Sequence, residues 1–170
     1  MIKSDDTYIF RKLEENEGPI MFGLVIERIK WMNENNIKHW NVLGYDKFFP
    51  QSYYEKRAQQ GYAYCLVDTN TNEILCAAVL LENDDSWGDN EPSIYIHNLI
   101  SKVGYPGIGK VFLKYTEDLA KSKGKKYLRL DSEVNNVKLT EYYDKLGYVP
   151  IGTCVYNDGV YNGVLRQKAI

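Results

Sequence analysis

The segment GYPGIGKV at residues 104–111 constrains the fold more than any other part of the sequence. Before it, SIYIHNLIS at residues 93–101 is rich in β-branched residues and alternates as a strand does. After it, apolar residues recur at helical spacing, at Ile108, Val111, Phe112, Tyr115 and Leu119. A strand that runs through a glycine loop into a helix predicts a mixed α/β fold.

The glycines of this loop predict an anion site at the start of the helix. The first amides of a helix have no carbonyl partner and lie at the positive end of the helix dipole. Gly107 and Gly109 have no Cβ atom to hold a phosphate away, and Lys110 adds a positive charge. A tight turn that uses glycine only for its dihedral angles is the alternative interpretation.

The loop falls one residue short of the nucleoside triphosphate pattern G-x-x-x-x-G-K-S/T. In that pattern the Ser/Thr hydroxyl binds magnesium, whereas this chain has Val111, which cannot bind a metal. Val111 therefore disfavours a metal-bound nucleoside triphosphate as the ligand of this loop. A magnesium-nucleotide enzyme remains as a competing hypothesis.

The rest of the chain continues the mixed pattern. A strand is expected at 7–13, a helix after Gly18-Pro19, and an aromatic loop leading to a short helix at 37–61. Residues 62–68 and 73–81 predict a hairpin. After the glycine loop come a helix ending at Gly124, a strand at 126–131, a helix from Asn135 or Asn136 to Gly147, and a closing hairpin that turns at 157–159.

Two motifs between residues 94 and 152 resemble the acetyl-coenzyme A binding half of the GNAT N-acetyltransferases. That family has a loop of the type Gln/Arg-x-x-Gly-x-Gly/Ala, and later a helix with Asn-x-x-Ala-x-x-x-Tyr-x-x-x-Gly-Phe/Tyr. The matching residues are Gly107 and Gly109 in the first motif, and Asn136, Leu139, Tyr143, Gly147 and Tyr148 in the second. Two positions depart from the family: Gly104 replaces Gln or Arg, and Leu139 replaces the commoner alanine.

The resemblance implies one N-acetyltransferase domain over residues 1–170. Its fold would be a mixed, mostly antiparallel central sheet with helices on both faces. Acetyl-CoA would be the co-substrate, without a metal, and the acceptor would be a small-molecule or peptide amine attacked directly. The implied cofactor-binding residues are Leu99, Ile100, Ser101, Gly107, Ile108, Gly109, Lys110, Asn136 and Tyr143. A non-catalytic acyl-CoA sensor would use the same residues and is the alternative.

Direct transfer needs a base for the amine proton and an acid for the departing thiolate. Tyr143 is the expected acid, since it lies seven residues from Asn136 and so on nearly the same helical face; a packing role is its alternative. His97 is the expected base because its intrinsic pKa suits proton transfer at neutral pH. The alternative for His97 is a purely structural role. Glu133 and a water chain to solvent are then the other candidates for the base.

Residues 20–61 are expected to cover the acceptor site by the same resemblance. This segment is rich in aromatic side chains, which would either line that site or fill the core: Trp31, Trp40, Tyr45, Tyr53 and Tyr54.

The charge and the cysteine content indicate which partners the protein can bind and in which cellular compartment it is expected. With 21 Lys and Arg against 23 Asp and Glu, the net charge is −2, which argues against a nucleic-acid partner. No run approaches the roughly 18 apolar residues of a membrane span, so no membrane partner is expected. The three cysteines are odd in number and widely spaced, which favours a reducing, cytoplasmic location. A homodimer is compatible with these features.

Overall fold

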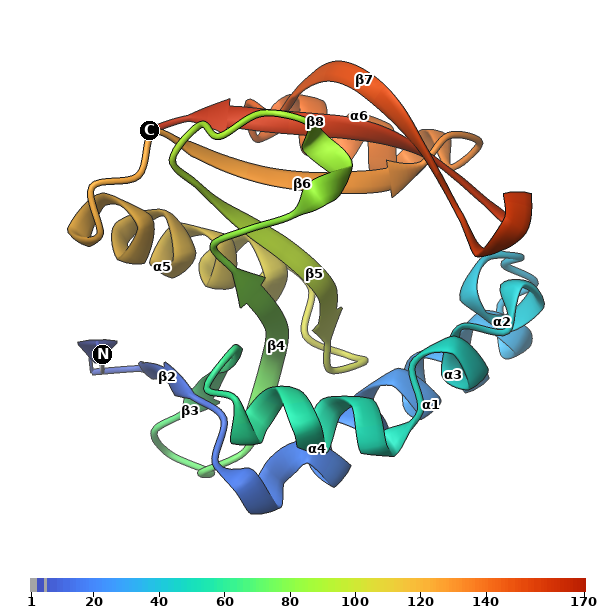
Figure 1. Ribbon diagram of the computed structural model, residues 1–170. Helices are drawn as coiled ribbons and strands as arrows, with labels where there is room; N and C mark the ends of the chain where they lie inside the picture. Colours follow the sequence, from blue (N-terminus) through green and yellow to red (C-terminus); the bar gives the residue numbers. More distant parts are fainter. Residues whose placement is uncertain (1–2, 5) are drawn as a thin grey trace. The chain divides into compact units, whose positions relative to one another are not determined.

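A computed structural model describes residues 3–4 and 6–170 of the chain (Figure 1). The chain forms two compact units. The first comprises Met1–Leu80 and Asn98–Thr116, and the second comprises Leu81–His97 and Glu117–Ile170. Strand β5 (Ser93–Ser101) and helix α5 (Ile108–Ser122) each contribute residues to both units.

The first unit contains an antiparallel sheet in the order β1-β2-β3-β4. Its strands are β1 (Lys3–Ser4), β2 (Tyr8–Lys12), β3 (Ala63–Asp68) and β4 (Ile74–Leu81). The predicted first strand and the predicted hairpin are therefore confirmed. Sequence reasoning did not anticipate β1, whose two residues are too few to show an alternating pattern.

The two faces of this sheet carry different side chains because neighbours on β2 point in opposite directions. Phe10 is fully buried and its ring lies 5.4 Å from that of Phe112 on α5. The next residue, Arg11, forms two hydrogen bonds of 2.8 and 2.9 Å to Glu17. Glu17 belongs to the short helix η1 (Glu15–Glu17), so helical segments cover both faces of the first unit's sheet.

The helices of the first unit pack closely at the start of α1 (Gly18–Glu34). A Cβ atom on Gly18 would lie 2.7 Å from the Cα atom of Glu55 in α4 (Gln51–Gln59), so only glycine fits there. Figure 1 shows α1 and α4 running alongside each other. The helix predicted after Gly18-Pro19 is confirmed, and its buried apolar residues include Met21, Val25 and Met32.

The aromatic segment 37–61 contains more helix than predicted. It forms α2 (Trp40–Leu43) and α3 (Tyr45–Phe48) before α4. Gly44 separates the two short helices in the left-handed conformation, with φ of 71°. Each of the two helices is four residues long, which is too short for helical periodicity to be visible in the sequence.

The strands of the second unit follow the order β5-β6-β8-β7. They are the start of β5, then β6 (Tyr127–Glu133), β8 (Tyr161–Ala169) and β7 (Val149–Tyr156). β5 and β6 are parallel, whereas β6 with β8 and β8 with β7 are antiparallel. The predicted mixed and mostly antiparallel sheet is confirmed, as are the predicted helix α6 (Val137–Lys145) and the closing hairpin.

Two buried arginines mark the two faces of this second sheet. Arg166 is 3% exposed and donates to Asp144 of α6 at 2.7 Å and to Ser132 at 3.1 Å. Arg129 is 2% exposed and points to the opposite face, toward loop 82–92. One face of the sheet is therefore covered by helix and the other by a loop.

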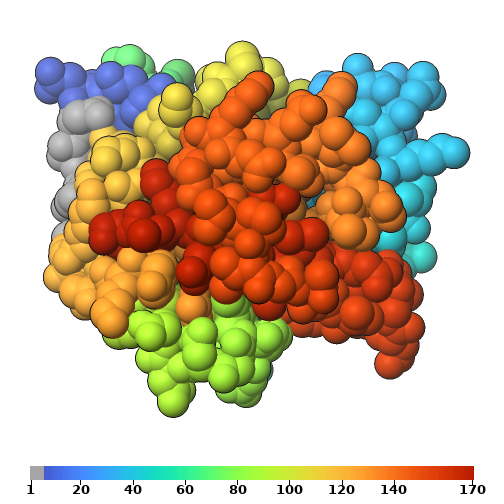
Figure 2. Space-filling model, turned by 90° about the horizontal axis from the view of Figure 1, so that it is seen from above, coloured from blue at the N-terminus to red at the C-terminus, as the bar shows by residue number. Residues whose placement is uncertain are grey.

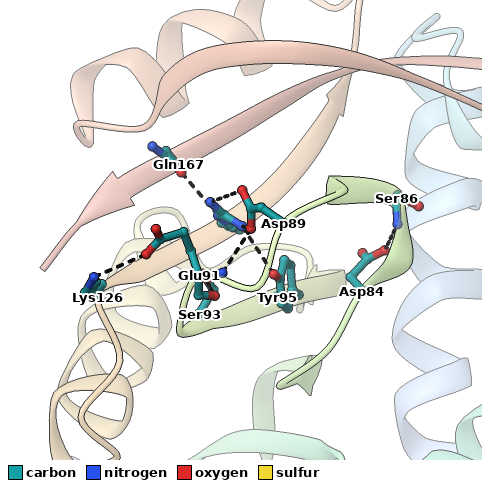
Figure 3. A network of polar contacts seen from close by, with 9 residues as sticks. Asp84, Ser86, Asp89, Glu91, Ser93, Tyr95, Lys126 and Gln167 are labelled. Atoms are coloured by element: carbon teal, nitrogen blue, oxygen red, sulfur yellow. Dashed lines mark hydrogen bonds and ion pairs between the residues drawn. The ribbon is translucent and has the colours of Figure 1, made fainter.

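Arg129 holds loop 82–92 in place. Figure 3 labels three of its partners, Asp89, Tyr95 and Gln167. Its guanidinium donates to both carboxylate oxygens of Asp89, at 2.6 and 3.0 Å, and also contacts Tyr95 and Gln167. The same group lies 4.6 Å from the ring centre of Trp87. Figure 2 shows the loop in light green at the surface, beside the C-terminal segment in orange and red. A loop with few apolar residues is thus ordered by one buried cation.

We expect Arg129→Ala to lower the free energy of unfolding by about 2–3 kcal/mol. The substitution removes a buried bidentate ion pair, but the partner Asp89 is 42% exposed and regains water, which limits the loss. Lys126→Ala is the matched control, because Lys126 pairs with Glu91 of the same loop at an exposed site. That control should cost less than about 0.5 kcal/mol. Equal losses in urea unfolding would contradict the assigned role of Arg129.

Candidate functional site

The glycine loop has the conformation that its sequence predicts. β5 ends at Ser101 and α5 begins at Ile108. Gly104 and Gly107 have φ of 91° and 85°, values that disfavour any residue with a Cβ atom. A Cβ atom added at either position would meet nothing within 4 Å. The loop therefore has open space around its two left-handed glycines.

Gly109 differs from these two glycines, because it is not among the described residues with positive φ. It is the second residue of α5, a position that residues with a Cβ atom can also occupy. Backbone strain therefore does not explain this glycine. A glycine at this position leaves the neighbouring amides uncovered, which suits a site for an anionic ligand.

The amides at the start of α5 are the donors of this candidate site. Ile108 N donates to Tyr105 O and Val111 N donates to Gly107 O, both at 3.3 Å. Across the described part of the chain, no acceptor is found for the amides of Gly109 and Lys110. The Lys110 side chain is exposed next to them, whereas the Ile108 side chain is 4% exposed and belongs to the core. The site is therefore made of backbone amides and one cation.

The end of β5 is fixed just before the loop. Arg28 of α1 donates to the Ser101 carbonyl at 3.0 Å and contacts its hydroxyl at 3.3 Å. Lys102 N donates to Leu75 O at 2.8 Å. Burial lowers the pKa of Arg28, whose guanidinium also lies 4.9 Å from the ring centre of Trp31. Ile100 is buried, and Leu99 and Ser101 are half-buried.

Asn98 is a feature that sequence reasoning missed. It has φ of 56° in the middle of β5, so the strand departs there from the extended conformation. Its Nδ2 donates to the Tyr45 hydroxyl at 2.7 Å, and its Oδ1 accepts from the Tyr53 hydroxyl at 2.8 Å. Asparagine is rare in strands and tolerates left-handed dihedral angles, so the residue type was the available signal.

Most of the aromatic side chains expected in residues 20–61 lie together in the first unit. Trp40 stacks on Tyr45 with ring centres 4.2 Å apart, and the chain of rings continues through Phe49 to Tyr53 and Tyr54. Tyr54 is fully buried and fills the core, while Trp40, Tyr45 and Tyr53 are half-buried. Trp31 packs separately against Arg28.

The second unit holds the three remaining predicted site residues, His97, Asn136 and Tyr143. Asn136 caps α6, because its Oδ1 accepts from Leu139 N at 3.0 Å. Tyr143 is 6% exposed, and its ring centre lies 5.7 Å from that of Tyr148. This packing suits a core role, and it also fixes the direction of the phenol ring that a proton donor needs.

The two predicted bases differ in their contacts. The Nε2 atom of His97 lies 3.0 Å from Oδ2 of Asp84 in loop 82–92. Both carboxylate oxygens of Glu133 instead accept from Asn135, at 2.8 and 3.3 Å, and so stabilise the turn after β6. Asp84 is a further residue that sequence reasoning missed, since it lies in a polar loop thirteen positions from His97.

No three His, Cys, Asp or Glu side chains in the described ranges are grouped to hold a metal ion. No helix in the part of the chain that the structure describes is long and apolar enough to cross a membrane.

Comparison with known proteins identifies the family. A model of the Acetyltransferase (GNAT) family matches residues 27–148. The chain therefore belongs to the GNAT acetyltransferase family, as its two motifs predicted. No curated protein matches the chain.

Solved structures with the same fold extend over nearly the whole chain. A GNAT-family acetyltransferase from Listeria monocytogenes is 18% identical, with all of both chains covered and a TM-score of 0.78. The PaiA N-acetyltransferase from Thermoplasma acidophilum, solved with coenzyme A, is 15% identical over 96% of this chain and 99% of that one, with a TM-score of 0.69. The ribosomal-protein-S5-alanine acetyltransferase from Vibrio fischeri is 13% identical over 99% and 96%, with a TM-score of 0.65.

We expect Gly109→Val to weaken coenzyme A binding while leaving the fold intact. Valine at the second position of α5 places a branched side chain beside the unpaired amides of Gly109 and Lys110. Loss of two charge-assisted hydrogen bonds corresponds to an affinity loss of at least ~10-fold. Calorimetric titration with coenzyme A measures this loss, and thermal unfolding checks the fold. Unchanged affinity together with a collapse in stability would show that the loop is only a structural turn.

Proposed function

We propose that the chain transfers an acetyl group directly from acetyl-CoA to an amine of a small molecule, a peptide or a protein. The main support is the glycine loop, where two unpaired amides, an unstrained Gly109 and the exposed Lys110 are suited to bind a diphosphate. The family match supports the same ligand, and a structural neighbour was solved with coenzyme A.

Bound acetyl-CoA would supply the activated acetyl group as a thioester. Gly107, Ile108, Gly109 and Lys110 would hold its diphosphate, and the end of β5 at Leu99, Ile100 and Ser101 would bind the rest of the cofactor. The motif on α6 adds Asn136 and Tyr143. Residues 27–148 match the family and include both sets, so we propose that both units form one transferase domain over residues 1–170.

Two side chains would move the protons of the reaction. His97 would take the proton of the acceptor ammonium, which leaves an amine with a free lone pair. Tyr143 would give its hydroxyl proton to the departing thiolate. Glu133 is the weaker choice of base, because both its carboxylate oxygens already accept hydrogen bonds from Asn135.

The acceptor is proposed to bind at the aromatic segment of the first unit. Trp40, Tyr45 and Tyr53 are half-buried there, and large aromatic faces attract amines. A protein amine and a small amine both fit this proposal; among the neighbours, the Vibrio fischeri enzyme is named for an alanine of a ribosomal protein. All three cysteines are free thiols, which supports a cytoplasmic location.

Thermal unfolding with different ligands tests the cofactor. Coenzyme A or acetyl-CoA at ~100 times its Kd should raise stability by ~2.7 kcal/mol, whereas ATP with magnesium should have no effect. The reverse result would favour a magnesium-nucleotide enzyme. Release of free thiol from acetyl-CoA, measured across a panel of amines and peptides, then tests transfer. Tight cofactor binding without turnover of any acceptor would favour an acyl-CoA sensor.

We expect Tyr143→Phe to lower kcat by at least ~10-fold with a nearly unchanged Kd for acetyl-CoA. General acids contribute ~10²–10⁴-fold, and the smaller value allows for water and for thiolate being a fair leaving group. Phenylalanine keeps the ring contact with Tyr148, so stability should change little. Tyr142→Phe is the matched control on the next position of the same helix. Parent-like turnover in the Tyr143 variant would leave this residue with a packing role alone.

A further inference from the structure

The contact between His97 and Asp84 is buried. Nε2 of His97 and Oδ2 of Asp84 are 3.0 Å apart, within ion-pair distance; both atoms are buried, and neither has an aligned hydrogen-bond partner among the described residues. The side chain of His97 is nevertheless 27% exposed, so its accessible part does not include Nε2. The imidazole therefore has one buried nitrogen facing a carboxylate and a further portion open to solvent.

The position of the Asp84 carboxylate is set independently of His97. Its Oδ1 accepts from Ser86 N at 2.9 Å and caps the short helix η2 (Asp85–Trp87), as Figure 3 shows. The loop is also anchored by the bidentate pair between Asp89 and the buried Arg129. The carboxylate is thus held rigidly against the histidine by its own loop.

Asp84 is ionised at neutral pH. Burial by itself would raise the pKa of Asp84, but the contacts with His97 and with the Ser86 amide outweigh it and lower that pKa below its ordinary value. An ionised carboxylate has no proton to donate and can only accept. At 3.0 Å this negative charge repels an imidazole lone pair and favours a hydrogen on the facing nitrogen, Nε2 of His97.

Other titratable groups face this pair from the neighbouring strands. Asp131 of β6 accepts from the Tyr161 hydroxyl of β8 at 2.7 Å, and burial raises the pKa of Asp131. Cys154 and Tyr156 of β7 lie near the two carboxylates, and burial raises the pKa of both, that of Cys154 to about 11. Among the described side chains, Asp84 alone lies within ion-pair or hydrogen-bonding distance of the imidazole.

We propose that Asp84 is a positioning residue that holds His97 in the Nε2–H tautomer, so that Nδ1 carries the lone pair that accepts the proton. This inference rests on the proposed function, in which His97 is the base. In the step, one N–H bond of the acceptor ammonium breaks and one N–H bond forms at Nδ1. The acceptor nitrogen keeps the electron pair, and the imidazolium that forms faces the carboxylate of Asp84.

The test compares Asp84→Asn with Asp85→Asn. Asparagine keeps an oxygen for the Ser86 amide, but its NH₂ group can face the imidazole and favour the opposite tautomer. Asp85 is the adjacent, exposed aspartate and controls for the loss of one charge from the loop. The chain has two histidines, so ¹⁵N spectra of the imidazoles, with His39→Gln for assignment, report the tautomer of His97 without any acceptor.

We expect protonated Nε2 and unprotonated Nδ1 in the parent protein, and loss of this preference in Asp84→Asn but not in Asp85→Asn. With an acceptor from the amine panel, Asp84→Asn should lower kcat by at least ~10-fold, with the KM for acetyl-CoA within about 2-fold of the parent value. An Nδ1–H tautomer in the parent, or an unchanged tautomer and kcat in Asp84→Asn, would overturn the proposal.

Two further variants keep the test decisive. If Asp84 acts through His97, the double variant Asp84→Asn/His97→Gln should be no slower than His97→Gln alone; an additional loss would refute the positioning role. Parent-like turnover of His97→Gln would refute the base assigned under the proposed function, and the catalytic role of Asp84 with it, while the ¹⁵N result would still report the tautomer. Asp84→Ser, which keeps a capping oxygen, replaces Asp84→Asn if the latter does not fold.

Discussion

The arrangement of β5 depends on the side-chain amide of Asn98. Its two hydrogen bonds to the hydroxyls of Tyr45 and Tyr53 hold a left-handed residue within the strand, a conformation that costs of order 1–3 kcal/mol and needs such support. Asn98 is also the residue at which β5 passes from one compact unit to the other. One side of this point carries His97, and the other leads through Ser101 into the glycine loop. The proposed base and the strand end that leads to the proposed cofactor loop therefore lie on either side of this one residue.

In the second unit, two buried arginines connect the sheet to the segments that cover it. Arg166 connects its sheet to α6 through Asp144, and Arg129 connects the opposite face to loop 82–92 through Asp89. The Arg129 guanidinium holds the pKa of Asp89 below its ordinary value, so the ion pair persists across neutral pH. A loop anchored in this way keeps Asp84 next to His97 without a hydrophobic core of its own. The polar network is therefore what orders this loop.

The sequence predicted those parts of the structure that are determined by residues close together in the chain. The glycine loop and the start of α6 follow from residue type and spacing, since Gly107 adopts a positive φ and Asn136 caps the helix. The short helices α2 and α3 escaped prediction because each spans four residues. The contact of Asp84 with His97 escaped it too, because a loop carboxylate and a strand histidine meet only through tertiary folding. An arginine in the strand YLRLD was a visible signal of a buried ion pair, but its partner was not.

The proposed cofactor binding and the proposed proton transfer depend on different kinds of contact, local in the first case and tertiary in the second. The proposed diphosphate site consists of backbone amides and of glycines that leave them uncovered, so it depends on a short stretch of chain. The proposed proton transfer depends instead on side chains from β5, loop 82–92 and α6, whose positions are fixed by Asp89, Arg129 and Tyr148. Neither motif that resembles the family contains Asp84 or Arg129. In the proposed mechanism, a variant that keeps the glycine loop but lacks these side chains would therefore bind acetyl-CoA without holding His97 in position, and the two functions could be lost separately.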